Sequence, residues 1–534
     1  MAVRAVARGA PPGYKPGDAA LLPHPHAIPA AGRRVNEPRD SMLDEARLAQ
    51  GSLGGHLARG SAWMVAWRWT VRLIGLVNTL IIARLLTPED FGLVAMAMLV
   101  VEFLTLFADT GYELALIRVA KPTRQHFDAA FTFQLMVYGA LAAVLLAVAP
   151  VAALGFGDPR VEPILQALAL RSALSAVCSV GVISFRMNLD FARDFRFGVY
   201  RKLVSFAITV SLVATFRSYW ALVWGIVLAE LGEVVLGYLM HPYRPRLSLA
   251  RMGDIASFSA WMVAGNISGY LTRAFDQLCV ARTVDLRAMG HYNVALDVAT
   301  APTLELVTPV SRAVFPVFSR YADDAARLRQ AYRDLLSIVA VVALSTAAGV
   351  ALVAQDMVYL VLGGQWLGAA PLVVWFALGA AAVGLADGAL NLLNVLHRER
   401  QTAGFGWART AVIVALVALA ATTGSVERIA QARALGLWLV LPPLFWLVCR
   451  AIDLPWTAVV GCLWRPALAA AGMAAAVTAL RVEALPAILR LLLDIAVGGA
   501  SFAALLLLMW WLAGRPAGAE RLALDALKQR LGRA

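Results

Sequence analysis

The stretch from Val71 to Arg118 contains two long apolar runs joined by the short turn Thr87-Pro88-Glu89-Asp90. Each run is long enough to cross the hydrocarbon core of a bilayer as a helix, which takes about 20 residues. Proline and acidic residues at the turn are typical of the start of a second helix. The sequence therefore predicts a helical hairpin that crosses a membrane and returns.

Charged side chains lie inside both runs of this hairpin. Arg68 and Arg72 fall in the first span, and Glu102 and Asp109 fall in the second. A charge at that depth costs about 2.5–3.5 kcal/mol on insertion scales, so it normally faces protein or a water-filled cavity. We expect a polar interior between the helices.

The composition of the chain agrees with a membrane protein. Hydrophobic residues make up 60% of the sequence and charged residues 15%, against roughly 25% charged in soluble domains. The net charge of +13 comes mostly from arginines in short loops, so it indicates membrane topology and not nucleic-acid binding. The four cysteines stand singly, which indicates neither a disulfide framework nor a metal site.

The apolar runs predict an all-α membrane protein with about fourteen transmembrane helices, in two pseudo-symmetric six-helix lobes plus two C-terminal helices. The predicted spans are 62–84, 91–111, 128–150, 163–185, 199–217, 219–240, 258–281, 290–312, 333–354, 370–396, 405–424, 428–449, 459–480 and 488–513.

The predicted domains follow from these spans. They are a disordered cytoplasmic tail at 1–60, an N-lobe at 61–243, a cytoplasmic amphipathic linker at 244–257, a C-lobe at 258–450, the two additional spans at 451–514 and a cytoplasmic amphipathic tail at 515–534.

The distribution of basic residues predicts the orientation of the chain. Arginine and lysine cluster in every second loop, and the intervening loop from Gln355 to Gly368 has none. Because basic residues are retained on the cytoplasmic side during insertion, this alternation favours an even number of spans with both termini in the cytoplasm.

An internal repeat supports two equivalent halves. A shift of 198 positions places Arg84 on Arg282, and Gly92 on Gly290. The shift equals six spans with their loops, so both halves would have the same orientation and be related by an axis along the membrane normal.

The segments ARLLTPEDFGLVAMAM and FADTGYELALIR resemble the first hairpin of the polysaccharide-transporter family, the WzxC-like flippases of lipid-linked oligosaccharides. That family belongs to the multidrug, oligosaccharidyl-lipid and polysaccharide exporter superfamily. FDQLCVARTVDLRAMGHYNVALDVATAP resembles its seventh and eighth spans, and GGQWLGAAP resembles the turn before its tenth. The resemblance covers roughly Ser61 to Cys449.

The resemblance implies two lobes around a central cavity, and export of undecaprenyl diphosphate-linked oligosaccharide by alternating access across the bacterial inner membrane. Membrane lipids, and a polysaccharide polymerase and glycosyltransferases, would be its partners. The diphosphate needs cationic groups, and arginine suits it because its planar fork makes bidentate, charge-assisted hydrogen bonds.

Four arginines are candidates for the diphosphate site: Arg72, Arg171, Arg273 and Arg68. Three of them have an alternative. Arg68 would snorkel to the interface, Arg171 would pair with Glu102 or Glu230, and Arg273 and Asp276 would neutralise each other, which we favour slightly over substrate contact.

The acidic residues inside spans are candidates for energy coupling or for ion pairs. They are Asp276, Glu102, Glu230, Asp387 and Glu305. Burial favours the neutral form of a carboxyl, so coupling to a proton or cation gradient, or to the membrane potential, stays open. No cofactor or metal is expected.

Several further residues have structural interpretations. We expect Arg84 and Arg282 to anchor the ends of their spans at the interface, and Trp366 to belong to an interfacial aromatic belt. We expect Arg244 to Ser257 to form a short amphipathic helix on the cytoplasmic surface.

Two other functions remain as alternatives. A membrane polymerase or ligase acting on lipid-linked sugars would need a large extramembrane loop, and the chain has none between spans much above twenty residues. A multidrug-exporter-like transporter would favour acidic cavity residues over arginine. No Gly-Lys dipeptide occurs, so the chain has no Walker A loop for ATP.

Overall fold

The computed structural model describes residues 70–75, 77–108, 112–119, 122–188, 190–253, 259–515, 518, 520 and 521. All regular elements in these ranges are helices, and each of the fourteen predicted spans contains helix. Arg68, Asp109 and most of the predicted terminal tails lie outside the described residues.

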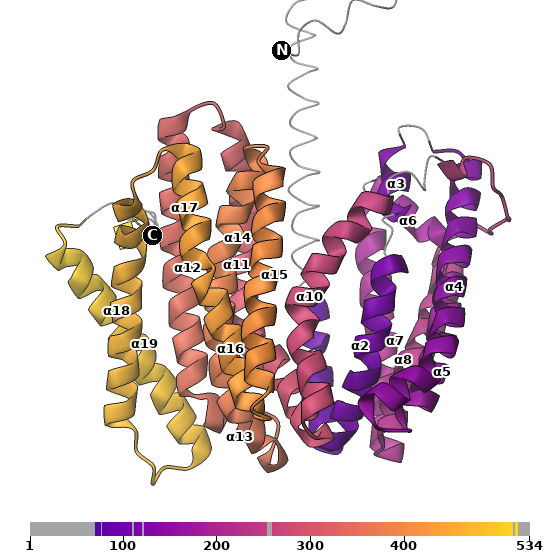
Figure 1. The fold of residues 1–534 in the computed structure, drawn as a ribbon, viewed down its shortest axis with the longest axis horizontal. Coiled ribbons are helices and arrows are strands. Elements are labelled where there is room, and N and C mark those ends of the chain that lie inside the picture. Colours follow the sequence, from indigo (N-terminus) through magenta and orange to yellow (C-terminus); the bar gives the residue numbers. More distant parts are fainter. Residues whose placement is uncertain are drawn as a thin grey trace, which may run out of the picture. The chain divides into compact units, whose positions relative to one another are not determined.

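The first half begins with helical residues 70–75 and 77–85. Its further helices are α2 Pro88–Ala108, α3 Tyr112–Arg118, α4 Arg124–Phe156, α5 Val161–Ala176, η1 Val180–Val182, α6 Ile183–Met187, α7 Phe191–Phe216 and α8 Tyr219–Met240. Helix α2 packs against α4, α5 and α8 within this half (Figure 1).

The second half contains α10 Ser259–Thr283, α11 Leu286–Arg320, α12 Ala325–Leu352, α13 Ala354–Val361, η2 Gly364–Ala369, α14 Ala370–Val395, α15 Glu399–Ala421, α16 Val426–Leu439 and α17 Leu441–Ile452. The last two helices are α18 Trp456–Leu480 and α19 Ala487–Leu512. Helix α14 is the most buried of these and packs against α11, α12 and α16, while α18 packs on α12 and on α19 (Figure 1).

The structure confirms a multi-pass helical membrane protein. Ten helices in the described part of the chain are long and apolar enough to span a membrane, or eleven if Val161–Ala176 and Val180–Met187, bent by 57°, form one span. Helix α11 is not among the ten, because Asp297, Glu305 and Arg312 lie along its length. The total of fourteen spans stays a prediction.

The turn of the opening hairpin forms as the sequence predicts. The Thr87 hydroxyl donates to Asp90 Oδ2 at 2.7 Å, and the Asp90 amide donates to Thr87 Oγ1 at 3.3 Å, which is a reciprocal cap at the start of α2. Pro88 occupies the first helical position, where no amide donor is needed. The Tyr219 amide also donates to Asp90 Oδ1 at 3.1 Å, so the turn ties α2 to α8.

The two glycines paired by the internal repeat lie against each other where α2 crosses α11. A Cβ on Gly92 would lie 1.9 Å from the carbonyl oxygen of Leu286, and a Cβ on Gly290 would lie 1.8 Å from that of Pro88. The shift of 198 positions also pairs Pro88 with Leu286. The halves therefore meet through equivalent backbone segments, which is the contact expected at a pseudo-two-fold axis.

The predicted amphipathic helix from Arg244 to Ser257 does not form over residues 244–249, and residues 254–257 lie outside the described part of the chain. Residues 241–249 are not helical. The Tyr243 hydroxyl donates to Asp128 Oδ1 at 2.7 Å, and the Ser248 amide donates to Thr132 Oγ1 at 2.9 Å, so α4 holds this segment extended. Pro242 and Pro245 favour an extended backbone and lack amide donors, which explains why helix does not form there.

Trp366 is not part of an interfacial belt. It is fully buried, and its indole Nε1 donates to the carbonyl oxygen of Ala83 at 2.6 Å. The preceding Gly363 has φ of +107°, a conformation that favours glycine, and the resulting turn directs η2 toward the first half.

Candidate functional site

An ion pair joins the first helix of the first half to α11 of the second half. Arg72 Nε lies 3.3 Å from Glu305 Oε1 of α11. Arg72 keeps 47% of its side chain exposed and Glu305 keeps 24%, so both groups stay accessible. The structure therefore brings together two predicted candidates, one cationic and one acidic.

Lys202 adds a second cation beside Arg72. Its ammonium lies against Gly75, one turn beyond Arg72, at 3.8 Å from the position of a Cβ. The charged side chains that interact with Lys202 are Arg201 and Arg72, both cations, and no carboxylate in the described chain bonds to it. Arg72 is paired with Glu305 and Lys202 has no carboxylate partner among the described residues, so two accessible cations share one acid and are a suitable site for an anion.

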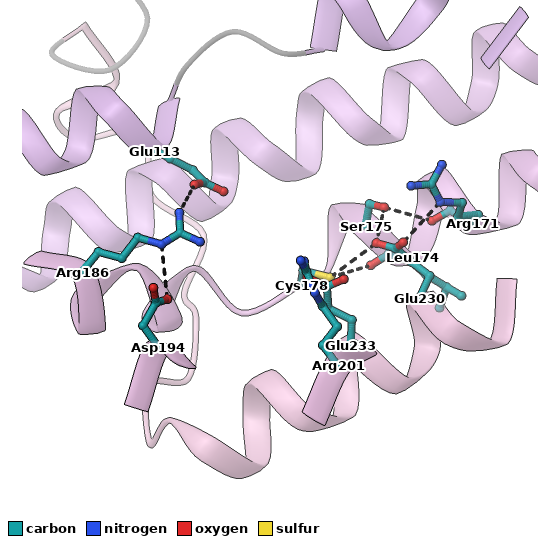
Figure 2. Close-up of polar contacts among 10 residues, drawn as sticks. All are labelled: Glu113, Arg171, Leu174, Ser175, Cys178, Arg186, Asp194, Arg201, Glu230 and Glu233. Atoms are coloured by element: carbon teal, nitrogen blue, oxygen red, sulfur yellow. Dashed lines mark hydrogen bonds and ion pairs between the residues drawn. The ribbon is translucent and has the colours of Figure 1, made fainter. Parts of the chain in front are cut away.

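A cavity of about 330 Å³ lies within the first half, with Arg171 and Arg201 in its wall. Arg171 Nε lies 3.3 Å from Glu230 Oε2, and Arg201 Nη1 lies 2.8 Å from Glu233 Oε1. Figure 2 shows both glutamates of α8 facing these arginines. Arg171 therefore has the partner expected in one of our alternatives, and the arginines of this first-half pocket are compensated.

The Ser175 hydroxyl also donates to Glu230 Oε1, at 2.5 Å (Figure 2). Glu230 thus receives bonds from two residues of α5, one turn apart. It fastens α8 to α5, and this structural role uses both of its carboxylate oxygens.

A larger cavity of about 460 Å³ lies in the second half, with Glu102 of α2 at its edge. We call it the second-half pocket. Three arginines line it: Arg273 of α10, Arg409 of α15 and Arg433 of α16. Its wall also contains Asp297, Thr272, Thr300, Gln277 and Trp375.

Hydroxyl groups hold α10 and α15 together beside this pocket. Thr410 Oγ1 lies 2.7 Å from Thr272 Oγ1 and 3.1 Å from Ser268 Oγ. Because Thr272 precedes Arg273 and Thr410 follows Arg409, this contact places the two guanidinium groups in the same cavity.

Arg433, and not Arg273, is the partner of Asp276. Arg433 Nη1 lies 2.6 Å from Asp276 Oδ2 and donates to the carbonyl oxygen of Arg273 at 3.1 Å. Tyr292 donates to the same carboxylate, which is 1% exposed. The favoured pairing of Arg273 with Asp276 is therefore wrong, because an arginine of α16, six α-helices further along the chain, binds the acid.

The other predicted acids occupy different positions. Glu102 reaches the second-half pocket, where it interacts electrostatically with Arg273. Asp387 is half-buried in α14 and lines neither of the two cavities in the described residues.

Arg84 and Arg282 form contacts between the halves and do not act only as interface anchors. Arg84 donates to the carbonyl oxygens of Leu360 and Val361, and Arg282 donates to that of Gly155. Both arginines thus reach the carboxyl end of a helix in the opposite half, where the exposed carbonyls attract cations. Gln365 extends the contact by donating to Ala83 and Leu86 at 2.9 and 3.0 Å.

Sequence reasoning missed four basic residues at these sites: Arg201, Lys202, Arg409 and Arg433. All four lie inside predicted spans. The rule that singled out Arg72 and Arg171, that a charge inside a span is functional by default, applies to them equally.

Comparison with known proteins identifies related chains. Residues 81–371, more than half of the sequence, match the model of a family described as polysaccharide biosynthesis protein. The succinoglycan biosynthesis transport protein ExoT of Rhizobium meliloti is 25% identical over 85% of this chain and 93% of its own length. The lipopolysaccharide biosynthesis protein WzxC of Escherichia coli is 26% identical over 58% of this chain and 63% of its own.

Solved structures share the fold. The lipid II flippase MurJ, in an inward closed conformation, has a TM-score of 0.69 at 10% identity, over 84% of this chain and 98% of that one. An inward-facing multidrug resistance transporter of the MATE family has a TM-score of 0.59 at 13% identity, over 72% of this chain and 94% of that one. At such identities the likeness shows the architecture alone.

Proposed function

We propose that this chain, which belongs to the polysaccharide biosynthesis protein family, moves an undecaprenyl diphosphate-linked oligosaccharide across the bacterial inner membrane. The chain is a multi-pass membrane transporter and not an enzyme: its relative ExoT is named for transport in succinoglycan biosynthesis, and its fold is that of the flippase MurJ. The anionic diphosphate is the part of this cargo that charged side chains must hold.

The observation that carries the proposal is the pair of accessible cations Arg72 and Lys202. A lipid-linked sugar presents a diphosphate at the junction between its lipid and its glycan. That group needs a guanidinium for bidentate hydrogen bonds and a second positive charge close by. Arg72 and Lys202 supply both, and a cationic drug would be repelled from the same place.

Glu305 occupies the position that the diphosphate would take in the loaded protein. Its carboxylate bonds to Arg72 across the halves. We propose that cargo binding exchanges this carboxylate for phosphate, which releases α11 from the first helix. The exchange would couple loading to movement of the two halves.

The direction of transport follows from the predicted orientation. With both termini in the cytoplasm, the contacts of Arg84 and Arg282 lie on the periplasmic side and close it, so the cargo would enter from the cytoplasm. A polymerase and glycosyltransferases would act before and after this step. A proton or cation gradient, or the membrane potential, would supply the energy.

Export of surface polysaccharide tests the proposal. In a strain that lacks the native gene, Arg72→Gln and Lys202→Gln should each reduce export by about tenfold or more, since a hydrogen bond to a charged group contributes about 1.5–3 kcal/mol. Arg320→Gln, on the exposed end of α11, is the matched control and should export normally. Immunoblots of membranes check the amount of each variant.

Accumulated lipid-linked oligosaccharide in the inner leaflet, measured in the same strains, separates a transport defect from a synthesis defect. Full export by both Arg72→Gln and Lys202→Gln would contradict the proposed site.

A further inference from the structure

We infer that the second-half pocket binds a negatively charged sugar, one that bears a carboxylate, within the glycan of the cargo. This inference rests on the proposed function and adds the chemical class of the glycan. It is carried by the charges in this pocket, which are arranged differently from those in the first half.

Two of the pocket's arginines line the same cavity without a close ion pair in the described part of the chain. Arg273 and Arg409 repel each other electrostatically, and neither forms an ion pair with any described residue. Arg409 Nε is buried and has no hydrogen-bond partner among the described residues. Two like charges and a buried, unsatisfied donor cost free energy, and an anion bound between them would reduce that cost.

The third arginine is already satisfied. Arg433 is bound by the buried carboxylate of Asp276 and by the backbone of Arg273. Its position is therefore fixed, and the charge left for a ligand belongs to Arg273 and Arg409.

The acids that face the pocket favour a sugar over a phosphate. Glu102 and Asp297 line it, and neither forms an ion pair within the described residues. Carboxylates accept hydrogen bonds from sugar hydroxyls, whereas they would repel the several charges of a diphosphate. A sugar acid carries a single charge beside several hydroxyl groups, so it suits a pocket in which two guanidinium groups without close ion pairs to described residues lie beside two acids.

The rest of the lining suits a sugar ring. Trp375 and Phe376 provide flat apolar surfaces, and Thr272, Thr300 and Gln277 provide polar groups. The volume of about 460 Å³ lies within the range of small-molecule sites, about 300–1,000 Å³.

The first-half pocket shows the contrast. Arg171 and Arg201 are each paired with a glutamate of α8, so that cavity offers no free cation to a carboxylate. This difference between the two pockets assigns the acidic sugar to the second-half pocket.

Three synthetic probes test the inference on the purified full chain in detergent. They are a short-chain polyprenyl diphosphate, the same lipid carrying a disaccharide that ends in glucose, and the same lipid carrying one that ends in glucuronic acid. Affinity is measured by microscale thermophoresis, and thermal melting checks that each variant is folded.

The wild-type chain should bind the glucuronate probe about tenfold or more tighter than the glucose probe, because hydrogen bonds to a charged group contribute about 1.5–3 kcal/mol. Arg409→Gln and Arg273→Gln should remove most of this preference, and Arg409→Lys, which keeps the charge, should retain part of it. Arg428→Gln, exposed in the first turn of α16, is the control and should keep the full preference. Arg72→Gln should weaken the binding of all three probes by a similar factor.

The outcomes separate the two proposals. Equal affinity of the wild-type chain for both disaccharides overturns the acidic-sugar inference and leaves the proposed function standing. A loss of affinity for the bare lipid diphosphate in Arg409→Gln, as large as that in Arg72→Gln, also overturns it, since the pocket would then bind phosphate. Failure of all three probes to bind contradicts the proposed function itself.

Discussion

A charged side chain inside a membrane span must find a partner, and the partner decides what remains for a ligand. Asp276 illustrates this, because its carboxylate bonds to Arg433 and leaves Arg273, three residues away on its own helix, exposed to a cavity. The spacing within α10 suggested the opposite pairing. Which of two arginines reaches an acid depends on the packing of α16 against α10, and the local sequence does not contain that information.

The presence of charged side chains inside the spans could be predicted, and the way in which they group could not. Arg72, Arg171 and Glu305 were identified from hydropathy alone, since each interrupts an apolar run. Lys202 comes near Arg72 only because its side chain extends from α7 to Gly75 of the first helix.

Asp356 allows a prediction on pH. It is 1% exposed in α13 and accepts hydrogen bonds from Arg481 at 2.6 Å and from Arg490 Nε at 2.9 Å. The bonds from Arg490 lower the pKa of Asp356 below its ordinary value. A lowered folded pKa stabilises the fold above the ordinary value, about 4, and this contribution is lost as the pH falls through the lowered pKa.

Asp356→Asn should therefore lower the melting temperature at neutral pH, and the difference from the wild-type chain should shrink as the pH falls below about 4. Thermal unfolding in detergent across this pH range measures it. Asp158→Asn, whose partner Arg160 keeps 50% of its side chain exposed, is the control and should have a smaller effect at every pH, because solvent screens the pair. A difference that stays constant with pH would show that the ion pairs of Asp356 do not contribute.

Helices and turns could be predicted from the sequence where residues close together in the chain determine the backbone conformation. The Thr87 to Asp90 turn combines a capping pair with proline at the first helical position, and all of its determinants lie within four residues. The linker after Tyr243 was predicted wrongly, because its extended form depends on acceptors from Asp128 and Thr132 of a distant helix.

The crossing of α2 and α11 gives a prediction on stability. A Cβ at Gly92 or Gly290 would overlap a carbonyl oxygen of the other helix, so Gly92→Ala and Gly290→Ala must push the helices apart. Overpacking of this kind costs about 1–3 kcal/mol, and both variants should melt at lower temperature. Gly139→Ala in α4, where a Cβ meets nothing within 4 Å, is the matched control.

Alanine has a higher helix propensity than glycine, so Gly139→Ala should be neutral or slightly stabilising. Unchanged melting of both Gly92→Ala and Gly290→Ala would show that the two helices do not cross at backbone contact.

At the scale of the whole molecule, the contacts of Arg84 and Arg282 hold the halves together at one end. Each arginine donates to backbone carbonyls of the opposite half. A hydrogen bond contributes about 1 kcal/mol, so Arg84→Ala and Arg282→Ala together should shift the population toward the form separated at this end.

The shift can be measured as a distance distribution between spin labels on Leu154→Cys and Tyr359→Cys, in a chain without the four native cysteines. The double alanine variant should show a larger population at long distance. Arg160→Ala, whose partner Asp158 lies in the same half, should leave the distribution unchanged. The idea that these contacts hold the halves closed fails if both variants match the parent chain.

The crossing of Gly92 and Gly290 also bears on how the chain arose. At each position a carbonyl oxygen of the other helix, Leu286 for Gly92 and Pro88 for Gly290, leaves no room for a side chain. A substitution in one copy of the repeat would therefore require the other copy to move. If the two halves arose by duplication, this glycine pair should be retained longer than most other similarities between them. An ancestral protein with a single repeat would have formed a symmetric dimer through the same helix crossing.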